Sequence, residues 1–376
     1  MLNLENIRER IDKTDKEIVR LFEERMQIVK EVAEFKISTD KPVLDKEREK
    51  EKIAALTKMA TDSFNQHGIE ELFIQIMAIS RKLQYKILAQ HGISSSIHFD
   101  EVKKIEKQKV KVAFQGVEGA YSQAAMFQYF GDNIESFHVQ TFSDAMKAAS
   151  EQRADYAVLP IENSSAGMVS DVYDLLMEYD VTIVGECYLK VEHALLGLPN
   201  AKLSDIRTVY SHPQGLMQCS KYLEQHREWQ QISQVNTAVS AKRVVEEGDP
   251  SKAAIASALA GTIYGLEVLE RGVNDNKNNT TRFIVVSNKK IYKDDANKVS
   301  VCFEIAHESG SLYNILSHFI YNNLNMTKIE SRPIPGRNWE YRFYVDFEGS
   351  LSDSGVKNAL NGIEAEASLL KILGNY

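Results

Sequence analysis

The chain has 376 residues, of which 43% are hydrophobic and 26% are charged, and its formal net charge is −8. This length exceeds what one hydrophobic core usually serves, so we expect two or three domains. The composition is typical of a soluble globular protein, and the acidic balance disfavours nucleic acid or an anionic membrane surface as the main partner. No apolar run approaches the roughly 20 residues that a membrane-spanning helix needs.

The cysteines are few and far apart. Cys187, Cys219 and Cys302 form neither a CxxC pair nor a zinc-type spacing. Sparse thiols are typical of a reducing compartment, and the first residues lack the apolar core of a signal peptide. We therefore expect a cytoplasmic protein with no metal and no organic cofactor.

The first 92 residues show helical spacing of apolar side chains. The stretch from residue 3 to about 37 contains no Pro and no Gly, and predicts one unusually long helix. Pro42 ends it, a second helix begins near Asp45, and a third spans about 69–89 after a turn at His67-Gly68. Three such helices cannot bury their own apolar stripes, so we expect a dimer that shares helices.

Several polar residues interrupt these apolar stripes. Arg25 and Lys36 share a face of the first helix, because steps of four, three and four residues connect them. Ser80 and Gln84 interrupt the third helix in the same way. Cations in an apolar groove are costly unless an anion meets them. The alternative is a solvated face with helix ion pairs, which is the usual explanation for an isolated Lys or Arg.

This helical part resembles the all-helical chorismate mutase family over residues 3–90. The residues that match the family's polar set are Arg8, Arg25, Lys36, Asp45, Arg48, Glu49, Ser80 and Gln84. The resemblance implies a pericyclic rearrangement of chorismate to prephenate. In that reaction an enzyme holds a dicarboxylate in its reactive conformer and stabilises charge on the breaking ether oxygen.

The resemblance implies that Arg8, Arg25 and Arg48 hold the carboxylates of the substrate. Arg8 lies seventeen residues before Arg25, which places it on a different face of a straight helix. We therefore expect Arg8 to serve the site of a second copy of the chain.

The remaining matched residues are implied to contact the rest of the substrate. Lys36 and Gln84 would donate to the ether oxygen, and Glu49 and Asp45 would meet the ring hydroxyl. Ser80 would support the substrate.

Residues 93–108 have no sustained apolar period and are interpreted as a polar linker. The expected domains are therefore a helical domain at 1–92, an α/β domain at 109–290 and a small domain at 298–376. The whole chain is expected to be multidomain.

In the second domain, apolar strands alternate with helices and are followed by polar turns. The turns are Gly116–Ser122, Glu162–Gly167 and Ser211–Gly215. Strand ends are the usual place for a ligand in an α/β sheet, although a helix-capping turn explains each almost as well. The pattern has two halves, which predicts two α/β lobes around a cleft, as in a solute-binding protein. His212 invites a general-base interpretation but more often plays a structural role beside Pro213.

Thr281-Arg282-Phe283 lies at the start of another apolar strand. Threonine hydroxyls and the arginine guanidinium can bind an anion and a leaving oxygen together at this position. With the three turns above, this motif resembles the prephenate dehydratase family over residues 110–288. The reaction removes hydroxide and carbon dioxide from prephenate to give phenylpyruvate, so it needs a proton donor and carboxylate anchors. The resemblance implies Thr281 as the donor, or as the group that positions it, while Arg282 orients a carboxylate or braces the cleft. The substrate-binding residues it implies are Asn163, Ser164, Ser211 and Gln218.

The C-terminal pattern is strand, helix, strand, strand, helix, strand, which predicts an α+β ferredoxin-like sandwich. The turn Gly310-Ser311-Leu312 and the segment Glu330-Ser331-Arg332 resemble the ACT domain of these dehydratases. That resemblance implies phenylalanine binding at a dimer interface and feedback inhibition. Without it, Arg332 would be interpreted as part of a surface ion pair.

The three resemblances together imply a bifunctional chorismate mutase and prephenate dehydratase of phenylalanine biosynthesis. It would act on chorismate and prephenate, bind phenylalanine as effector, and form a homodimer or homotetramer. One alternative is a dehydratase whose helical part is an inactive dimerisation module. The other is a non-enzymatic amino-acid sensor.

Overall fold

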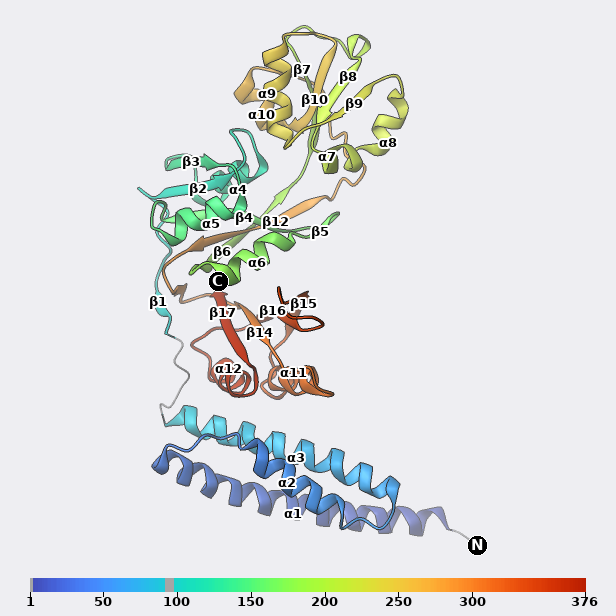
Figure 1. Cartoon of the computed structure of the whole chain (residues 1–376), viewed down its shortest axis with the longest axis vertical. Coiled ribbons are helices and arrows are strands. Elements are labelled where there is room, and N and C mark those ends of the chain that lie inside the picture. Colours follow the sequence, from blue (N-terminus) through green and yellow to red (C-terminus); the bar gives the residue numbers. More distant parts are fainter. Residues whose placement is uncertain (1–2, 92–97) are drawn as a thin grey trace. The chain divides into compact units, whose positions relative to one another are not determined.

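The structure is a computed structural model that describes residues 3–91 and 98–376. It contains two compact units. Unit 1 comprises Met1–His98 and Asn297–Ile372, and unit 2 comprises Phe99–Ala296 and Leu373–Tyr376 (Figure 1). No helix in the described part of the chain combines the length and the apolarity that crossing a membrane requires.

Unit 1 begins with three helices, α1 (Leu4–Thr39), α2 (Lys46–Thr57) and α3 (Ser63–Gln90). Asp45 caps α2 and Asp62 caps α3, each by accepting a backbone N–H three residues later. The turn predicted at His67-Gly68 is wrong, because Gly68 lies inside α3. The Asp62 cap starts this helix earlier than predicted, and one interior glycine costs only about 1 kcal/mol.

Most of the apolar side of α1 is exposed. In this helix only Val29 and Ala33 are buried. The large apolar side chains that it exposes are Leu4, Ile11, Ile18, Val19, Leu21, Ile28, Val32 and Phe35. So many large apolar side chains exposed on one helix are typical of a surface that another protein chain covers.

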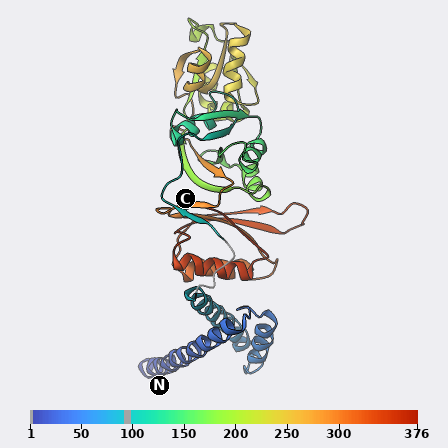
Figure 2. The ribbon, with the colours of Figure 1, turned by 90° about the vertical axis from the view of Figure 1, so that its left-hand side faces the viewer.

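Unit 1 ends with an α/β sandwich. Its elements are β14 (Lys298–Glu304), α11 (Ser311–Tyr321), β15 (Met326–Pro333), β16 (Tyr341–Glu348), α12 (Ser354–Glu366) and β17 (Leu369–Asn375). The sheet order is β15-β16-β14-β17, and Figure 2 shows the two helices on one face of the sheet. Phe319 of α11 packs edge-on against Phe347 of β16, with ring centres 5.0 Å apart. The element order and the sheet order are those of the predicted ferredoxin-like sandwich.

The first lobe of unit 2 is a sheet covered by helices. Its strands, in the order β6-β12-β4-β2-β3, are β6 (Thr182–Lys190), β12 (Thr280–Ser287), β4 (Tyr156–Asn163), β2 (Lys111–Gln115) and β3 (Glu135–Val139), and the short β5 (Gly167–Met168) pairs with β4. The helices are α4 (Tyr121–Phe130), α5 (Phe142–Ser150) and α6 (Ser170–Glu178). The core contains Phe114, Met126 and Phe283.

Part of the predicted linker at 93–108 is structured. Residues 92–97 lie outside the described residues. Beyond them, β1 (Asp100–Val102) pairs in parallel with β13 (Ile291–Lys293), and Ile105 is buried in the core of the first lobe. The linker prediction is therefore corrected for residues 100–108, where Ile105 and the partly buried Val102 anchor a mostly polar segment to the core.

The second lobe contains a five-stranded sheet. Its strands, in the order β11-β7-β10-β8-β9, are β11 (Glu267–Arg271), β7 (His193–Gly197), β10 (Lys252–Ser257), β8 (Thr208–Ser211) and β9 (Gln230–Ser233). The helices are α7 (Pro213–Gln218), α8 (Ser220–Leu223), α9 (Thr237–Glu247) and α10 (Ala258–Tyr264), with short 3-10 turns at Leu203–Asp205 and Glu224–His226. Leu195 and Leu196 enter separate cores on the two faces of this sheet, as strand alternation requires.

The chain crosses between the two lobes twice, at residues 191–192 and 272–279. The crossings are hydrogen-bonded together, because the Val191 N–H donates to the Asn279 carbonyl at 2.8 Å and the Val273 N–H donates to the His193 carbonyl at 3.0 Å. The Asn274 side chain accepts from the His193 N–H at 3.2 Å and donates to the Val191 carbonyl at 3.3 Å. We call this region the interlobe junction. It confirms the two-lobed architecture that the sequence predicts.

All three cysteines are buried thiols. Cys187 lies in the core of the first lobe, Cys219 in a core of the second lobe, and Cys302 in β14 of the sandwich. Burial raises the pKa of Cys187 to about 11 and the pKa of Cys219 and of Cys302 to about 12.

Candidate active sites

In the helical part of unit 1, the predicted cations of α1 face the predicted acids of α2. The Lys36 ammonium donates to the Val43 carbonyl at 2.6 Å. Burial lowers the pKa of Lys36, and the negative charges of Asp45 and Glu49 oppose that shift. Burial likewise lowers the pKa of Arg25, against the charge of Glu49. Arg48 also acts on Lys36 electrostatically, so these charged side chains lie near one another.

Ser80 and Gln84 of α3 reach the same site. The Arg25 guanidinium donates to the Ser80 hydroxyl, and the Gln84 amide donates to the Ser80 carbonyl at 3.3 Å. The Gln84 Oε1 atom is buried and has no partner among the described residues. An unsatisfied buried polar atom costs about 1–3 kcal/mol, so this position is suited to a ligand or a group from another chain.

Arg8 is not brought together with these residues. It is exposed on the N-terminal half of α1. At 1.5 Å per residue it lies about 25 Å along the helix from Arg25. One chain therefore does not place Arg8 in its own site.

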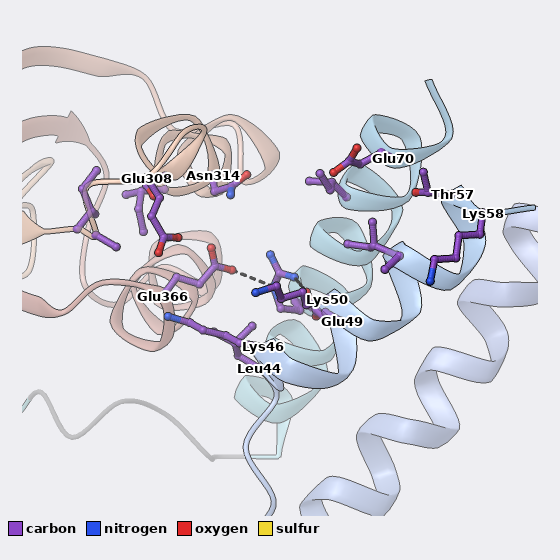
Figure 3. A pocket seen from close by; sticks show the side chains of 18 residues that line it. Leu44, Lys46, Glu49, Lys50, Thr57, Lys58, Glu70, Glu308, Asn314 and Glu366 are labelled. Atoms are coloured by element: carbon purple, nitrogen blue, oxygen red, sulfur yellow. Dashed lines mark hydrogen bonds and ion pairs between the residues drawn. The ribbon is translucent and has the colours of Figure 1, made fainter. Parts of the chain in front are cut away.

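Arg81 is a buried residue of this region that sequence reasoning missed. Its guanidinium pairs with Glu49 of α2 and, at 2.9 Å, with Glu366 of α12, which also contacts the His318 ring at 3.2 Å. Glu366 and Glu49 line a cavity of about 720 Å³ within unit 1 (Figure 3). The sequence feature that could have identified Arg81 is its position on the apolar stripe of α3, four residues after Met77 and four before Tyr85.

In unit 2, Thr281 and Asn163 are directly paired across β12 and β4. The Asn163 NH2 group donates to the Thr281 hydroxyl and to the Asn279 side-chain oxygen, both at 2.8 Å. The carbonyl end of Asn163 is held in turn by the N–H groups of Ser165 and Ala166. Because the Thr281 oxygen accepts from Asn163, the Thr281 proton can be donated elsewhere, and no described residue accepts it.

Ser164 belongs to the same turn. Its hydroxyl accepts from the Thr280 N–H at 2.9 Å, and its own N–H donates to the Thr280 carbonyl at 2.9 Å. Ser164 therefore fixes the start of β12 immediately before Thr281.

Arg282 is buried and makes several contacts on the opposite face of β12 from Thr281. Its guanidinium donates to Glu186 at 2.7 Å and to the Tyr376 hydroxyl at 2.8 Å, and Glu162 lies 3.9 Å away. Successive residues of a strand face opposite sides of the sheet. Of the two roles left open by the sequence, this geometry favours bracing over binding of a carboxylate.

Ser211 and Gln218 are both in the second lobe but differ in exposure. The Ser211 hydroxyl is fully buried and donates to the Ile255 carbonyl at 2.7 Å, so its proton is used within the protein. Gln218 is partly exposed at the interlobe junction, and its side-chain oxygen lies 3.0 Å from the buried His193 ring. The other ring nitrogen of His193 lies 2.9 Å from the Tyr121 hydroxyl. Sequence reasoning missed His193 and the contact of Tyr121, although Tyr121 lies in one of the quoted motifs.

The loop around Gly119 and the residue His212 both have structural roles. The Gly119 N–H is occupied by the Gln123 side chain at 2.7 Å, and a Cβ at Gly119 would meet Ala260 at 2.7 Å. This loop is therefore a close packing contact between lobes. His212 caps α7 by accepting from the Gln214 N–H at 3.2 Å, which is a structural role.

In the sandwich, the two predicted effector elements lie at one end of the sheet. Arg332 of β15 is paired with Arg342 of β16, which donates to Glu304 at 2.9 Å where β14 ends. The chain continues from Glu304 to Gly310, whose φ of 83° suits glycine, and Ser311 and Leu312 then begin α11. Glu330 shares the sheet face of Arg332, whereas Ser331 lies on the other face.

Comparison with known proteins bears on both sites. Residues 112–291 match the prephenate dehydratase family, and residues 7–85 match chorismate mutase type II. The bifunctional chorismate mutase/prephenate dehydratase of Escherichia coli strain K12 is 35% identical over 376 residues, which cover 98% of this chain and 95% of that protein. The chain belongs to the bifunctional chorismate mutase/prephenate dehydratase family.

Two solved structures are similar to this chain over 71% of its length. The prephenate dehydratase of Arthrobacter aurescens in complex with L-Phe is 30% identical, with a TM-score of 0.66 over 71% of this chain and 89% of that one. GqqA, described as a novel type of quorum quenching acylase, is 34% identical, with a TM-score of 0.66 over 71% of this chain and 97% of that one. Each of these two comparisons covers 71% of the chain, whereas the bifunctional relative from Escherichia coli covers 98% of it.

Proposed function

We propose that this chain catalyses two consecutive reactions, the rearrangement of chorismate to prephenate and the conversion of prephenate to phenylpyruvate. The single observation that carries the second reaction is the hydrogen bond from Asn163 to Thr281. It leaves the Thr281 hydroxyl as a donor at the start of a buried strand.

In the dehydratase step, the Thr281 hydroxyl donates a hydrogen bond to the hydroxyl that leaves prephenate as hydroxide, while the C–C bond that breaks to release carbon dioxide supplies the electron pair that makes the ring aromatic. Asn163 orients Thr281, and the Gln218 amide meets a substrate carboxylate. Ser164 and Ser211 form supporting walls, because their hydroxyls are engaged with the backbone. Arg282 braces β12 through Glu186.

In the mutase step, Arg25 and Arg48 hold the carboxylates together with Arg8 of a second copy. Lys36 and Gln84 stabilise the negative charge that develops on the ether oxygen. Asp45, Glu49 and Ser80 contact the rest of the substrate. The exposed apolar face of α1 supports a homodimer, and a tetramer would be formed from such dimers.

We further propose that phenylalanine binds the sandwich at the end of the sheet formed by Gly310–Leu312 and Glu330–Arg332, and that it inhibits the enzyme. The complex of the Arthrobacter aurescens relative with L-Phe supports the choice of phenylalanine as the ligand. Three buried, unpaired thiols support operation in the reducing cytoplasm.

The deciding experiment supplies the purified chain with chorismate, with and without phenylalanine, and identifies the products by chromatography. We expect phenylpyruvate, at a rate that falls when phenylalanine is added. Prephenate as the final product would contradict the role of Thr281. Consumption of prephenate but not of chorismate would leave a dehydratase with an inactive helical module.

A further inference from the structure

Three side chains from three elements form a hydrogen-bonded series at the interlobe junction. Tyr121 begins α4 in the first lobe, His193 begins β7 after the first crossing, and Gln218 ends α7 in the second lobe. The Tyr121 hydroxyl lies 2.9 Å from His193 Nδ1, and His193 Nε2 lies 3.0 Å from Gln218 Oε1. The two rings meet edge-on with centres 5.5 Å apart. The series therefore connects the first lobe to the Gln218 amide, which we propose to bind the substrate.

The direction of donation follows from the chemistry of the ring. His193 is 2% exposed, and burial lowers its pKa, so the imidazole is neutral near neutral pH and has one N–H and one acceptor nitrogen. Gln218 Oε1 is an acceptor, so Nε2 carries the proton. Nδ1 then accepts the proton of the Tyr121 hydroxyl, which also lies 3.1 Å from the Glu192 carbonyl but has only one proton to donate. Donation runs from Tyr121 to His193 to Gln218.

The His193 backbone is fixed from both sides. Its N–H donates to the Asn274 side chain, and its carbonyl accepts from the Val273 N–H. The Gln218 carbonyl accepts from the Asp275 N–H at 2.8 Å. Both residues are thus tied to the second crossing, which limits how far either side chain can move.

This arrangement leaves the NH2 group of the Gln218 amide available. Its oxygen is taken by His193, and its NH2 group has no protein partner among the described residues. Gln218 is partly exposed, so this group is available to a ligand. Two N–H donors on a fixed amide are suited to a carboxylate.

We propose that Tyr121 and His193 are positioning residues of the dehydratase reaction, which orient the Gln218 amide so that its NH2 group meets a carboxylate of the substrate. This inference rests on the proposed function of Gln218. Neither Tyr121 nor His193 needs to touch the substrate, because both act through Gln218.

A double-mutant cycle on the full-length chain tests this proposal, with prephenate as substrate. Tyr121→Phe keeps the ring and removes only the hydroxyl, and we expect it to lower kcat/KM about three- to tenfold, mainly through KM. Gln218→Ala should lower kcat/KM further. In the Gln218→Ala background, Tyr121→Phe should have no additional effect, because the group through which it acts is absent.

A second pair of variants tests the ring. His193→Gln offers an amide N–H near the position of Nε2, whereas His193→Leu offers no donor, so we expect His193→Gln to retain the lower KM of the two. Tyr222→Phe is the matched control, because its hydroxyl bonds Glu270 at 2.8 Å within the second lobe and should leave kcat/KM unchanged. Turnover of chorismate by the same preparations checks their concentration and the integrity of unit 1.

The possible failures are distinguishable. If Tyr121→Phe lowers kcat/KM by the same factor with and without Gln218, its effect is structural and the positioning role is overturned, while the role of Gln218 stands. If Gln218→Ala leaves kcat/KM unchanged, the proposed contact of Gln218 with the substrate is overturned, and the positioning role is overturned with it. Equal KM values for His193→Gln and His193→Leu would show that the N–H of the His193 ring does not orient Gln218, and would overturn the role of His193.

Discussion

Thr280 and Thr281 are neighbours on β12 whose side chains point to opposite faces of the strand. The Thr280 hydroxyl donates to the Asn278 carbonyl at 3.1 Å, whereas the Thr281 hydroxyl accepts from Asn163. We expect Thr281→Ala to reduce kcat for prephenate about a hundredfold or more, because a positioned proton donor is removed. Thr280→Ala is the matched control and should retain most of the rate. Near-normal kcat in Thr281→Ala would contradict the assignment, whereas unchanged chorismate turnover would show that unit 1 is intact.

Lys36 leads to a pH prediction at the same scale. Burial disfavours its charged form and lowers its pKa, and a neutral amine cannot stabilise negative charge on the ether oxygen. The kcat/KM for chorismate should therefore fall as the pH rises through a value below the ordinary lysine pKa of 10.5. In Lys36→Arg this alkaline fall should move to higher pH, whatever the absolute rate. A fall at the same pH in both proteins would assign it to another group.

Helix α1 is the element that is least suited to a chain that functions alone. It exposes an apolar face and carries Arg8 about 25 Å from its own Arg25. If α1 is shared between two copies, refolding Arg8→Ala together with Lys36→Ala should restore about a quarter of the mutase sites, since half of the dimers are mixed and each has one intact site. The measurement is chorismate turnover by the mixture, compared with each variant refolded alone.

The control for this experiment is a second pair of variants. Arg25→Ala and Lys36→Ala change the same site of one chain, so refolding them together should restore activity only if α1 contributes Arg25 to the site of its partner. We expect no restoration for this pair. If the Arg8 pair also fails to recover activity, Arg8 does not serve the second site.

At the scale of the whole molecule, residues Leu373–Tyr376 belong to unit 2 although the rest of β17 belongs to unit 1. The Tyr376 hydroxyl accepts from Arg282, immediately after Thr281 in the chain. Tyr376→Phe should lower the free energy of unfolding of unit 2 by about 1.5–3 kcal/mol, the usual contribution of a hydrogen bond to a charged group. Urea unfolding followed by the fluorescence of the buried Trp229 measures this, since the other tryptophan, Trp339, is 78% exposed in unit 1. An unchanged midpoint, as expected for the control Tyr341→Phe, would show that Arg282 does not depend on Tyr376.

The sequence predicted the order of elements well because local patterns determine it. The spacing of apolar residues predicted the long first helix, and runs of β-branched residues predicted the strands. The two are distinguishable because side chains repeat with a different period in a helix and in a strand. The turn at Gly68 failed because the cap at Asp62 outweighed the local signal of one glycine. Thr281 and Asn163 were identified because each stands in a recognisable motif beside a strand end.

Contacts between distant side chains were not predictable in the same way. Arg81 and Glu366 are 285 residues apart, and Tyr121 and His193 are 72 residues apart. Nothing in the local sequence around His193 indicates that its ring is held between two lobes. Such pairs depend on the tertiary arrangement, and a single sequence contains no pattern that specifies it.

The three buried thiols supply a built-in set of reporters for local unfolding. Each stands in a different folded part, namely the two lobes and the sandwich, and each is protected both by burial and by a raised pKa. An alkylating reagent can reach a thiol of this kind only when the surrounding part opens. The rate of modification at each cysteine, measured by mass spectrometry of peptides, would therefore give the opening free energy of each part separately, without any engineered label. Added phenylalanine or prephenate should then slow modification in the part that binds it, so the native sequence itself can show where each ligand acts.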